Sequence, residues 1–214
     1  MRLRIKICGL KYAENIQAVA ALQPDYMGFI FYPHSLRYVG REFQLPGGRP
    51  WPAARVGVFV NENHRNIIYL ARQHRLTHLQ LHGNETPEFC AKLYQAGFTI
   101  IKAFGLHGGF DFRLLQAYKG AVHYFLFDTL SEGYGGTGKT FNWTLLNGYQ
   151  LDVPFFLSGG LSAEVLKQNT LPAHPQLHAL DINSGVEDRP GWKNTLKIQE
   201  LLHIIKQYDH EIPG

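Results

Sequence analysis

The chain has 214 residues, of which 45% are hydrophobic and 18% are charged, and it carries a net charge of +4 at pH 7. This length suits one α/β domain spanning residues 1–214, and a core of that size needs neither disulfides nor a metal. No apolar stretch approaches the roughly 20 residues that cross a membrane. The basic residues form no run typical of nucleic-acid binding, so the positive charge favours a small anionic ligand.

Apolar runs typical of buried strands alternate with segments of helical periodicity along the chain. The expected strands are residues 3–8, 25–31, 55–60, 77–81, 98–104, 122–128, 153–158 and 177–182. The expected helices are residues 14–22, 63–74, 87–95, 110–118, 142–148, 162–168 and 193–208. Eight strands with helical crossovers predict a (β/α)₈ barrel of the TIM type, with a doubly wound open sheet as the alternative. Proline and glycine between residues 40 and 54 predict an irregular second crossover.

The number of cysteines indicates whether the protein works in a reducing or an oxidising compartment. Only Cys8 and Cys90 are present, and the N-terminus lacks the pattern of a signal peptide. A reduced, cytoplasmic protein is expected.

Functional groups of a barrel enzyme collect at the carboxyl ends of its strands. The polar residues expected there are Cys8, Arg37, Asn61, Gln80, His82, Asp128, Ser158, Asp181 and Asn183. The Cys8 thiol can serve as a proton acceptor or as a nucleophile. The Asp128 carboxyl follows a very apolar strand, which suits a general acid, although a capping role is the alternative. Lys6 shares the inner face with Cys8, and an interior ion pair is its expected role.

Two glycine-bearing turns follow the last two strands, at Ser158–Gly160 and at Asn183–Gly185. Glycine allows backbone N–H groups to approach a phosphate closely. Barrels commonly bind phosphate with this pair of loops. We therefore expect a phosphorylated anionic ligand at Gly159, Gly160, Ser184 and Gly185.

Two further patterns are weaker. Residues 133–140 match the phosphate-binding loop of nucleotide hydrolases, but the five residues 128–132 separate them from the apolar run of the preceding strand, and the next helix is short. A glycine-rich lid over the rim is the preferred interpretation. His78 and His82 point to the same side of one strand, but no third ligand completes a zinc site, and no metal is expected. Gln80 and His82 are expected to hydrogen-bond a substrate or neighbouring strands.

Taken together, these motifs resemble the phosphoribosylanthranilate isomerase family of tryptophan biosynthesis. The resemblance extends from the first strand to the last helix. It rests on residues 6–9 (Lys6-Ile7-Cys8-Gly9), 28–38, 56–61, 80–83 (Gln80-Leu81-His82-Gly83), 127–129, 135–143, 157–161 and 181–187 (Asp181-Ile182-Asn183-Ser184-Gly185-Val186-Glu187). The Pro/Gly-rich second crossover and Asn183 are the departures from the family pattern.

The resemblance implies an Amadori rearrangement without a cofactor or metal. Asp128 would be the general acid and Cys8, as thiolate, the general base. Arg37 would bind the anthranilate carboxylate. The remaining substrate contacts would come from His82, Gly159, Gly160, Asp181, Asn183, Ser184 and Gly185. Either a monomer or a homodimer is compatible with such a barrel.

Two other functions are weighed against this one. The related isomerase of histidine biosynthesis uses a carboxylate on the first strand and shows half-barrel repetition, and neither is found here. A phosphate-ligand binding protein that has kept the barrel without chemistry is the alternative from another class, and the presence of Cys8, Asp128 and Arg37 together argues against it.

Overall fold

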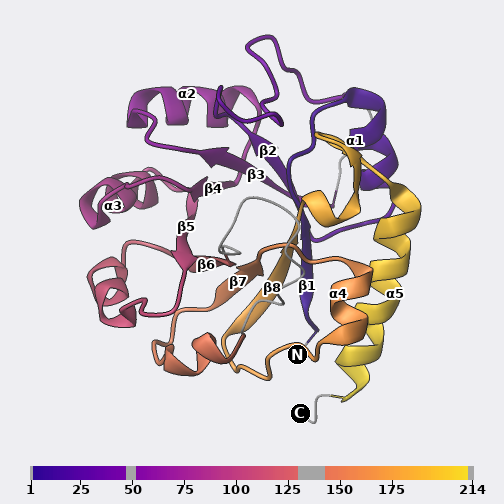
Figure 1. Cartoon of the computed structure of the whole chain (residues 1–214). Coiled ribbons are helices and arrows are strands. Elements are labelled where there is room, and N and C mark those ends of the chain that lie inside the picture. Colours follow the sequence, from indigo (N-terminus) through magenta and orange to yellow (C-terminus); the bar gives the residue numbers. More distant parts are fainter. Residues whose placement is uncertain (1, 47–51, 130–142, 212–214) are drawn as a thin grey trace.

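The computed structural model describes residues 2–46, 52–129 and 143–211. Eight parallel strands form a closed barrel in sequence order, with β1 hydrogen-bonded to β8 (Figure 1). The strands are β1 Arg4–Ile7, β2 Tyr26–Ile30, β3 Ala54–Phe59, β4 His78–Leu81, β5 Thr99–Leu106, β6 Tyr124–Thr129, β7 Phe155–Ser158 and β8 Leu177–Ile182. The predicted barrel is therefore confirmed.

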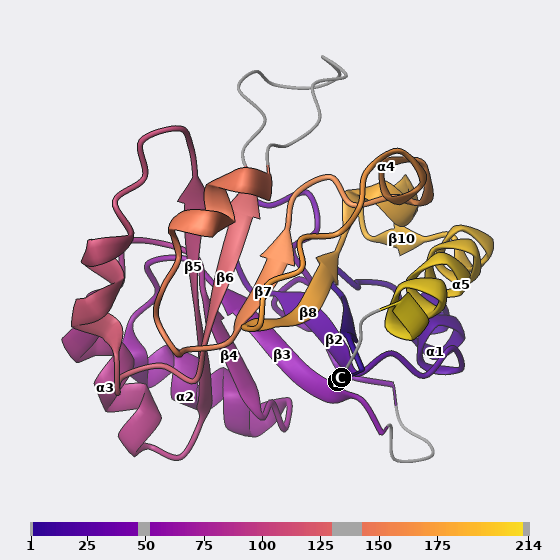
Figure 2. The ribbon, with the colours of Figure 1, turned by 90° about the horizontal axis from the view of Figure 1, so that it is seen from below.

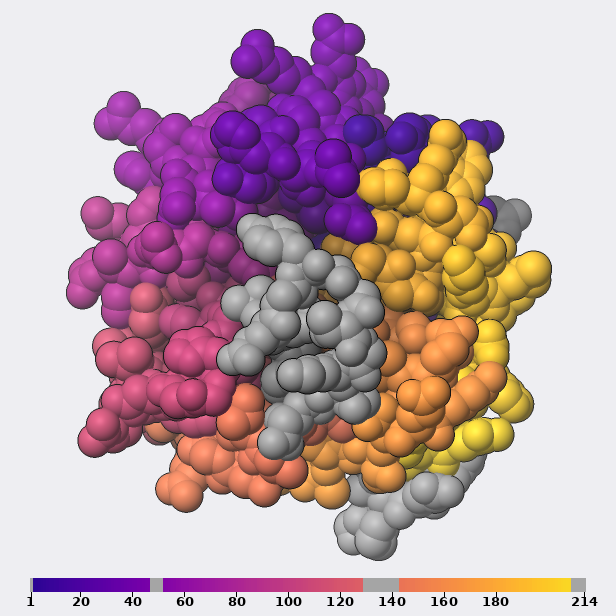
Figure 3. Space-filling model, viewed as in Figure 1, coloured from indigo at the N-terminus to yellow at the C-terminus, as the bar shows by residue number. Residues whose placement is uncertain are grey.

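Helices surround the barrel, as Figures 1 and 2 show. The α-helices are α1 Ala13–Ala20, α2 His64–Gln73, α3 Pro87–Gln95, α4 Ala163–Gln168 and α5 Thr195–Glu211. Three short 3₁₀ helices are η1 Phe112–Tyr118, η2 Trp143–Gly148 and η3 Ser184–Val186, and β9 Glu187–Arg189 pairs with β10 Trp192–Lys193 after β8. In Figure 3 the colours pass around the rim in sequence order, because each crossover advances by one strand.

Where helices were expected at 110–118 and 142–148, the described residues form the 3₁₀ helices η1 and η2. Both adopt the tighter i→i+3 bonding, although α4, with six residues, is no longer than either and is an α-helix. In η1, for example, the Leu114 amide bonds to the Asp111 carbonyl at 3.1 Å. The antiparallel pair β9–β10 was not predicted.

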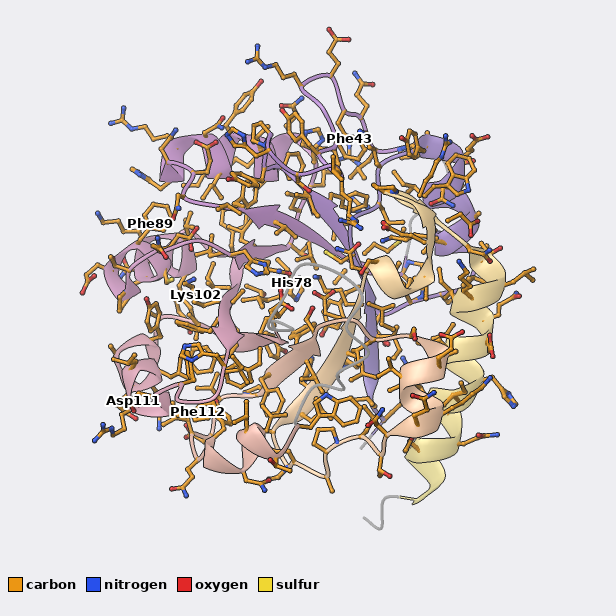
Figure 4. The ribbon with its side chains drawn as sticks, viewed as in Figure 1. Phe43, His78, Phe89, Lys102, Asp111 and Phe112 are labelled. Atoms are coloured by element: carbon orange, nitrogen blue, oxygen red, sulfur yellow. The ribbon has the colours of Figure 1, made fainter. Side chains whose placement is uncertain are left out.

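The second crossover is irregular, as predicted. Its described parts, residues 31–46 and 52–53, contain turns and no helix. Phe43, labelled in Figure 4, takes the place of a packing helix. Its ring lies 5.6 Å from that of Phe29 on β2 and 5.4 Å from that of His74 at the end of α2.

Side chains alternate between two cores because strand residues point to opposite faces. One core lies inside the barrel and consists of Tyr26, Val56, Ile101, Ala103, Leu126, Phe156 and Ala179. A much larger core lies between the strands and the surrounding helices. The same alternation brings Lys6, Gln80 and Asp181 to the inner face, above the apolar layer.

Polar and aromatic side chains pack inside the amino end of the barrel. The Tyr26 hydroxyl lies 2.8 Å from His178 Nε2, and the Arg4 guanidinium lies 3.0 Å from His178 Nδ1. Burial lowers the pKa of His178 to about 4, which keeps its ring neutral. The ring of His78, near the barrel axis in Figure 4, packs edge-on against that of Tyr26. This packing leaves the carboxyl end as the place for a ligand.

Among the described residues, no helix is both long and apolar enough to cross a membrane.

The inner core predicts a contrast between two leucines. Leu126 is fully buried inside the barrel, whereas Leu196 in α5 is 73% exposed. We expect Leu126→Ala to lower the free energy of unfolding by about 2–5 kcal/mol, because it leaves a cavity. Leu196→Ala, the matched control, should change it by less than about 0.5 kcal/mol. Urea unfolding of the two variants measures both values, and equal losses would contradict this assignment of the core.

Candidate active site

Cys8 lies just beyond the end of β1, and its side chain is buried at the carboxyl end of the barrel. Its backbone N–H bonds to the Ile182 carbonyl of β8 at 2.8 Å. A Cβ atom on Gly28 of β2 would come within 2.7 Å of the Cys8 sulfur. The absence of a side chain at Gly28 therefore makes room for the thiol.

Lys6 lies on the same face as Cys8, two residues earlier, and is fully buried. Its ammonium donates hydrogen bonds to Asp181 Oδ1 at 2.8 Å and to Gln80 Oε1 at 2.7 Å. The predicted interior ion pair is thus confirmed. Burial acts to lower the pKa of Lys6, but Asp181 and Cys8 outweigh it and hold the pKa above its ordinary value. Lys6 is therefore a cation.

The ionisation of Cys8 depends on two opposing effects. Burial raises the pKa of the thiol, while the nearby Lys6 ammonium lowers it through charge and a hydrogen bond. Burial is the larger effect, so the pKa lies above its ordinary value and the thiol is the favoured resting form. Lys6 is the group that stabilises a thiolate when one forms.

Asp128 lies near the end of β6, and β6 is separated from β1 by two strands on one side and four on the other. Its side chain is 28% exposed, so the carboxyl can reach a ligand in the barrel mouth. The nearest ring nitrogen, His82 Nε2, lies 3.6 Å from Asp128 Oδ2. On the other side of that ring, His82 Nδ1 lies 3.0 Å from Gln80 Nε2.

A second charged cluster surrounds Arg37. Glu187 accepts hydrogen bonds from Arg37 Nε at 3.0 Å and from Nη2 at 2.6 Å, which engages one edge of the guanidinium. The buried Lys193 ammonium donates to Glu187 Oε1 at 2.7 Å and to Asn183 Oδ1 at 2.7 Å. Burial acts to raise the pKa of Glu187, but Arg37 and Lys193 outweigh it and hold the pKa below its ordinary value.

Gly9 allows this cluster to approach Cys8. Its φ of +75° is in the left-handed region that favours glycine. A Cβ atom there would lie 2.6 Å from Asn183 Oδ1 and 2.7 Å from Arg37 Cδ. Because Gly9 has no side chain, the Arg37 cluster can lie close to Cys8.

The two predicted phosphate loops lie against each other. Gly159 and Gly160 have φ values of +112° and +64°, so both need the freedom of glycine. A Cβ atom on Gly185 would overlap the carbonyl oxygen of Leu161. The turn after β8 can approach the turn after β7 only because residue 185 lacks a side chain. Ser162 caps α4 by accepting a hydrogen bond from the Val165 amide.

Most of the predicted site residues are brought together at this end of the barrel, and several have partners within the protein, among them Arg37 with Glu187 and His82 with Gln80. Asp181 bonds Lys6, and Asn183 bonds Lys193. Four residues of the site were not predicted from the sequence: Gly9, Gly28, Glu187 and Lys193. Glu187 lies in a segment that carried the family resemblance, whereas nothing in the sequence pattern pointed to Lys193.

Two other expectations concern metals and the lid. Within residues 2–46, 52–129 and 143–211, no group of three or more His, Cys, Asp or Glu side chains could hold a metal ion. The segment 133–140, interpreted above as a lid, lies outside the described residues.

A family model and curated relatives of this chain point to one family of enzymes. The family model for "N-(5'phosphoribosyl)anthranilate (PRA) isomerase" matches residues 5–203. The N-(5'-phosphoribosyl)anthranilate isomerase of Phocaeicola vulgatus is 44% identical over 203 residues, which cover 95% of this chain and 98% of that relative.

Two solved structures are similar as well. Monomeric forms of the dimeric phosphoribosylanthranilate isomerase of Thermotoga maritima align with a TM-score of 0.73 at 29% identity, covering 95% of this chain and 98% of that one. A phosphoribosyl anthranilate isomerase in complex with reduced 1-(o-carboxyphenylamino)-1-deoxyribulose 5-phosphate gives the same score and identity, covering 96% and 99%.

The Arg37 cluster predicts a pH-dependent contribution to stability. Glu187 has a lowered pKa when folded. Its contribution is therefore complete above the unfolded pKa of about 4.5 and is lost as the pH falls through the folded value. We expect Glu187→Gln to cost about 3 kcal/mol of unfolding free energy at pH 7 and much less at pH 3.

The control for this prediction is Glu200→Gln, which breaks the exposed ion pair with Lys167. It should cost less than about 1 kcal/mol at either pH. Denaturant unfolding at both pH values makes the comparison. A pH-independent loss for Glu187→Gln would show that the carboxylate charge does not matter.

Proposed function

This chain belongs to the N-(5'-phosphoribosyl)anthranilate isomerase family, and we propose that Cys8 and Asp128 carry out the proton transfers of that isomerisation. It catalyses the Amadori rearrangement of N-(5-phosphoribosyl)anthranilate, an aldose-to-ketose isomerisation in tryptophan biosynthesis. The observation that carries the proposal is the position of Cys8 beside Lys6 on β1, and of Asp128 beside His82 on the far side of the barrel mouth.

The first step is opening of the ribose ring. Asp128 donates its proton to the ring oxygen while the C1–O bond breaks, and the nitrogen lone pair forms the C=N⁺ bond of an iminium ion. The partial exposure of Asp128 supports this role, because a substrate in the barrel mouth can contact the carboxyl while β6 keeps its position.

Before the second step the resting Cys8 thiol loses its proton to solvent, and the resulting thiolate then removes the C2 proton. The electrons of the C–H bond form the C1=C2 double bond, and the nitrogen recovers its lone pair. The resulting enolamine tautomerises to the ketone as the proton leaves the 2-hydroxyl and C1 gains a proton. Acid precedes base for an electrostatic reason: the iminium charge adds to that of Lys6 and favours the thiolate.

Binding of the substrate uses the groups around these two residues. Arg37 is held by Glu187 along one edge, and its Nη1 lies on the other edge, where it can bind the anthranilate carboxylate. The turns containing Gly159, Gly160, Ser184 and Gly185 bind the phosphate through backbone N–H groups. Asp181 and Asn183 contribute by holding Lys6 and Lys193.

Location and assembly are part of the same proposal. Both cysteines are free thiols, which is compatible with a cytoplasmic enzyme. The barrel suits a monomer or a homodimer, and the Thermotoga maritima relative is dimeric.

The role of Cys8 is tested with fresh N-(5-phosphoribosyl)anthranilate, whose fluorescence disappears on turnover. We expect Cys8→Ala to lower kcat by roughly 10²–10⁴-fold, the usual contribution of a general base. Cys8→Ser should also be poor, because a hydroxyl is a weaker base than a thiolate at neutral pH. Cys90→Ala replaces the other buried cysteine, on α3, and should keep kcat near the wild-type value. More than a tenth of wild-type kcat in Cys8→Ala would refute the assignment.

Asp128 and Arg37 should give different kinetic profiles in the same assay. Asp128 acts as charge moves in the transition state, so Asp128→Asn should lower kcat sharply with KM nearly unchanged. Arg37 holds the substrate in both states, so Arg37→Ala should raise KM by roughly one to three powers of ten. Arg37→Lys should recover only part of the loss, since lysine cannot make a planar two-point contact. Identical profiles for the Asp128 and Arg37 variants would end this division of roles.

A further inference from the structure

A continuous series of polar contacts crosses the inside of the barrel from β1 to β6. It begins at the buried Lys6 ammonium, which donates to Gln80 Oε1 at 2.7 Å. Gln80 Nε2 lies 3.0 Å from His82 Nδ1, and His82 Nε2 lies 3.6 Å from Asp128 Oδ2. Lys6 is also the partner of Cys8. The proposed acid and the proposed base are thus connected through one cation.

The direction of each hydrogen bond in this series follows from the chemistry of Lys6. An ammonium can only donate, so the Gln80 carbonyl oxygen must face it. The Gln80 NH₂ group then faces His82, and this group can only donate. His82 Nδ1 must therefore be the acceptor, which puts the ring proton of neutral His82 on Nε2, the nitrogen next to Asp128. The other tautomer would set two donors against each other.

We propose that Lys6, acting through Gln80, fixes His82 in the neutral Nε2–H tautomer, and that this makes Gln80 a positioning residue for the acid Asp128. This inference rests on the proposed function only for the role of Asp128. A neutral imidazole presents its Nε2–H to the Asp128 carboxyl, 3.6 Å away, without forming an ion pair. An imidazolium would hold Asp128 ionised and thereby weaken it as an acid. The Gln80 amide opposes that state, because it faces Nδ1 with a donor.

The charges around Gln80 and His82 agree with this assignment. Lys6 of β1 is the cation next to Gln80, and its charge is balanced by Asp181 of β8. Cys8 lies beside Lys6 and is neutral in the resting state. On the neighbouring strand, Lys102 is paired with Glu85 at 3.2 Å. In the described part of the chain, Asp128 is therefore the acidic group that could stabilise an imidazolium, and the Gln80 amide acts against it from the other side of the ring.

The test begins with the unmodified protein and needs no activity. Nitrogen NMR of protein labelled at histidine reports which ring nitrogen carries the proton, and the His82 signals are assigned by their loss in His82→Asn. At pH 7.5 we expect His82 Nδ1 to be the unprotonated nitrogen and Nε2 the protonated one. Protonated Nδ1 in the wild type would overturn the inference, whatever reaction the enzyme catalyses.

The variant that tests causation is Gln80→Glu, which keeps the size and replaces the NH₂ donor by an acceptor. We expect Nδ1 of His82 to become protonated, and kcat to fall by about tenfold or more with little change in KM. The alkaline limb of the kcat profile, where the general acid loses its proton, should move as well, because Asp128 then faces a different partner. A changed protonation state with unchanged kcat and pH profile would refute the positioning role.

Two controls complete the experiment. Gln116→Glu makes the same charge change at an exposed position of η1 and should alter neither His82 nor kcat. Gln80→Leu removes both contacts without adding charge, so His82 should lose its tautomer preference and kcat should fall. If Gln80→Leu keeps the pure Nε2–H tautomer, Gln80 does not fix it. Absence of any isomerase activity in the wild type would instead refute the proposed function and leave the NMR result standing.

Discussion

The buried ammonium of Lys6 determines which side chains can surround it inside the barrel. A cation removed from water is costly unless charges and acceptors compensate for its lost hydration. Asp181 from β8 supplies the charge, and Gln80 from β4 supplies a carbonyl acceptor. The same cation makes a thiolate at Cys8 less costly than burial alone would allow. Lys6 thus links side chains from three strands, β1, β4 and β8, next to the proposed base.

A second buried lysine plays a comparable role on the other side of Cys8. Lys193 holds Glu187 and Asn183, and Glu187 in turn orients Arg37. The two charged clusters come close together because Gly9, between them, has no side chain to keep Arg37 and Asn183 away. Charge pairing therefore sets the positions of Arg37 and Lys193, and the missing Cβ of Gly9 allows the two clusters to approach closely.

Much of the fold could be predicted from the sequence because it depends on local periodicity. Short runs of apolar, branched residues bounded by glycine mark parallel strands that are buried on both faces. Their number and the intervening helical segments indicate the barrel. The prediction was less accurate at η1 and η2, because a helical residue pattern does not separate α from 3₁₀ bonding and α4 is just as short.

The sequence by itself determined which groups lie at the carboxyl rim, because a strand of known direction places its last polar residue there. Cys8 and Asp128 were identified in this way. Only the tertiary structure decided which partner each group receives, because those partners come from distant segments. Glu187 meets Arg37 across 150 residues, and Lys6 meets Asp181 across 175. Such pairs are set by barrel closure and by the direction in which each side chain leaves its strand, and neither is encoded in a local pattern.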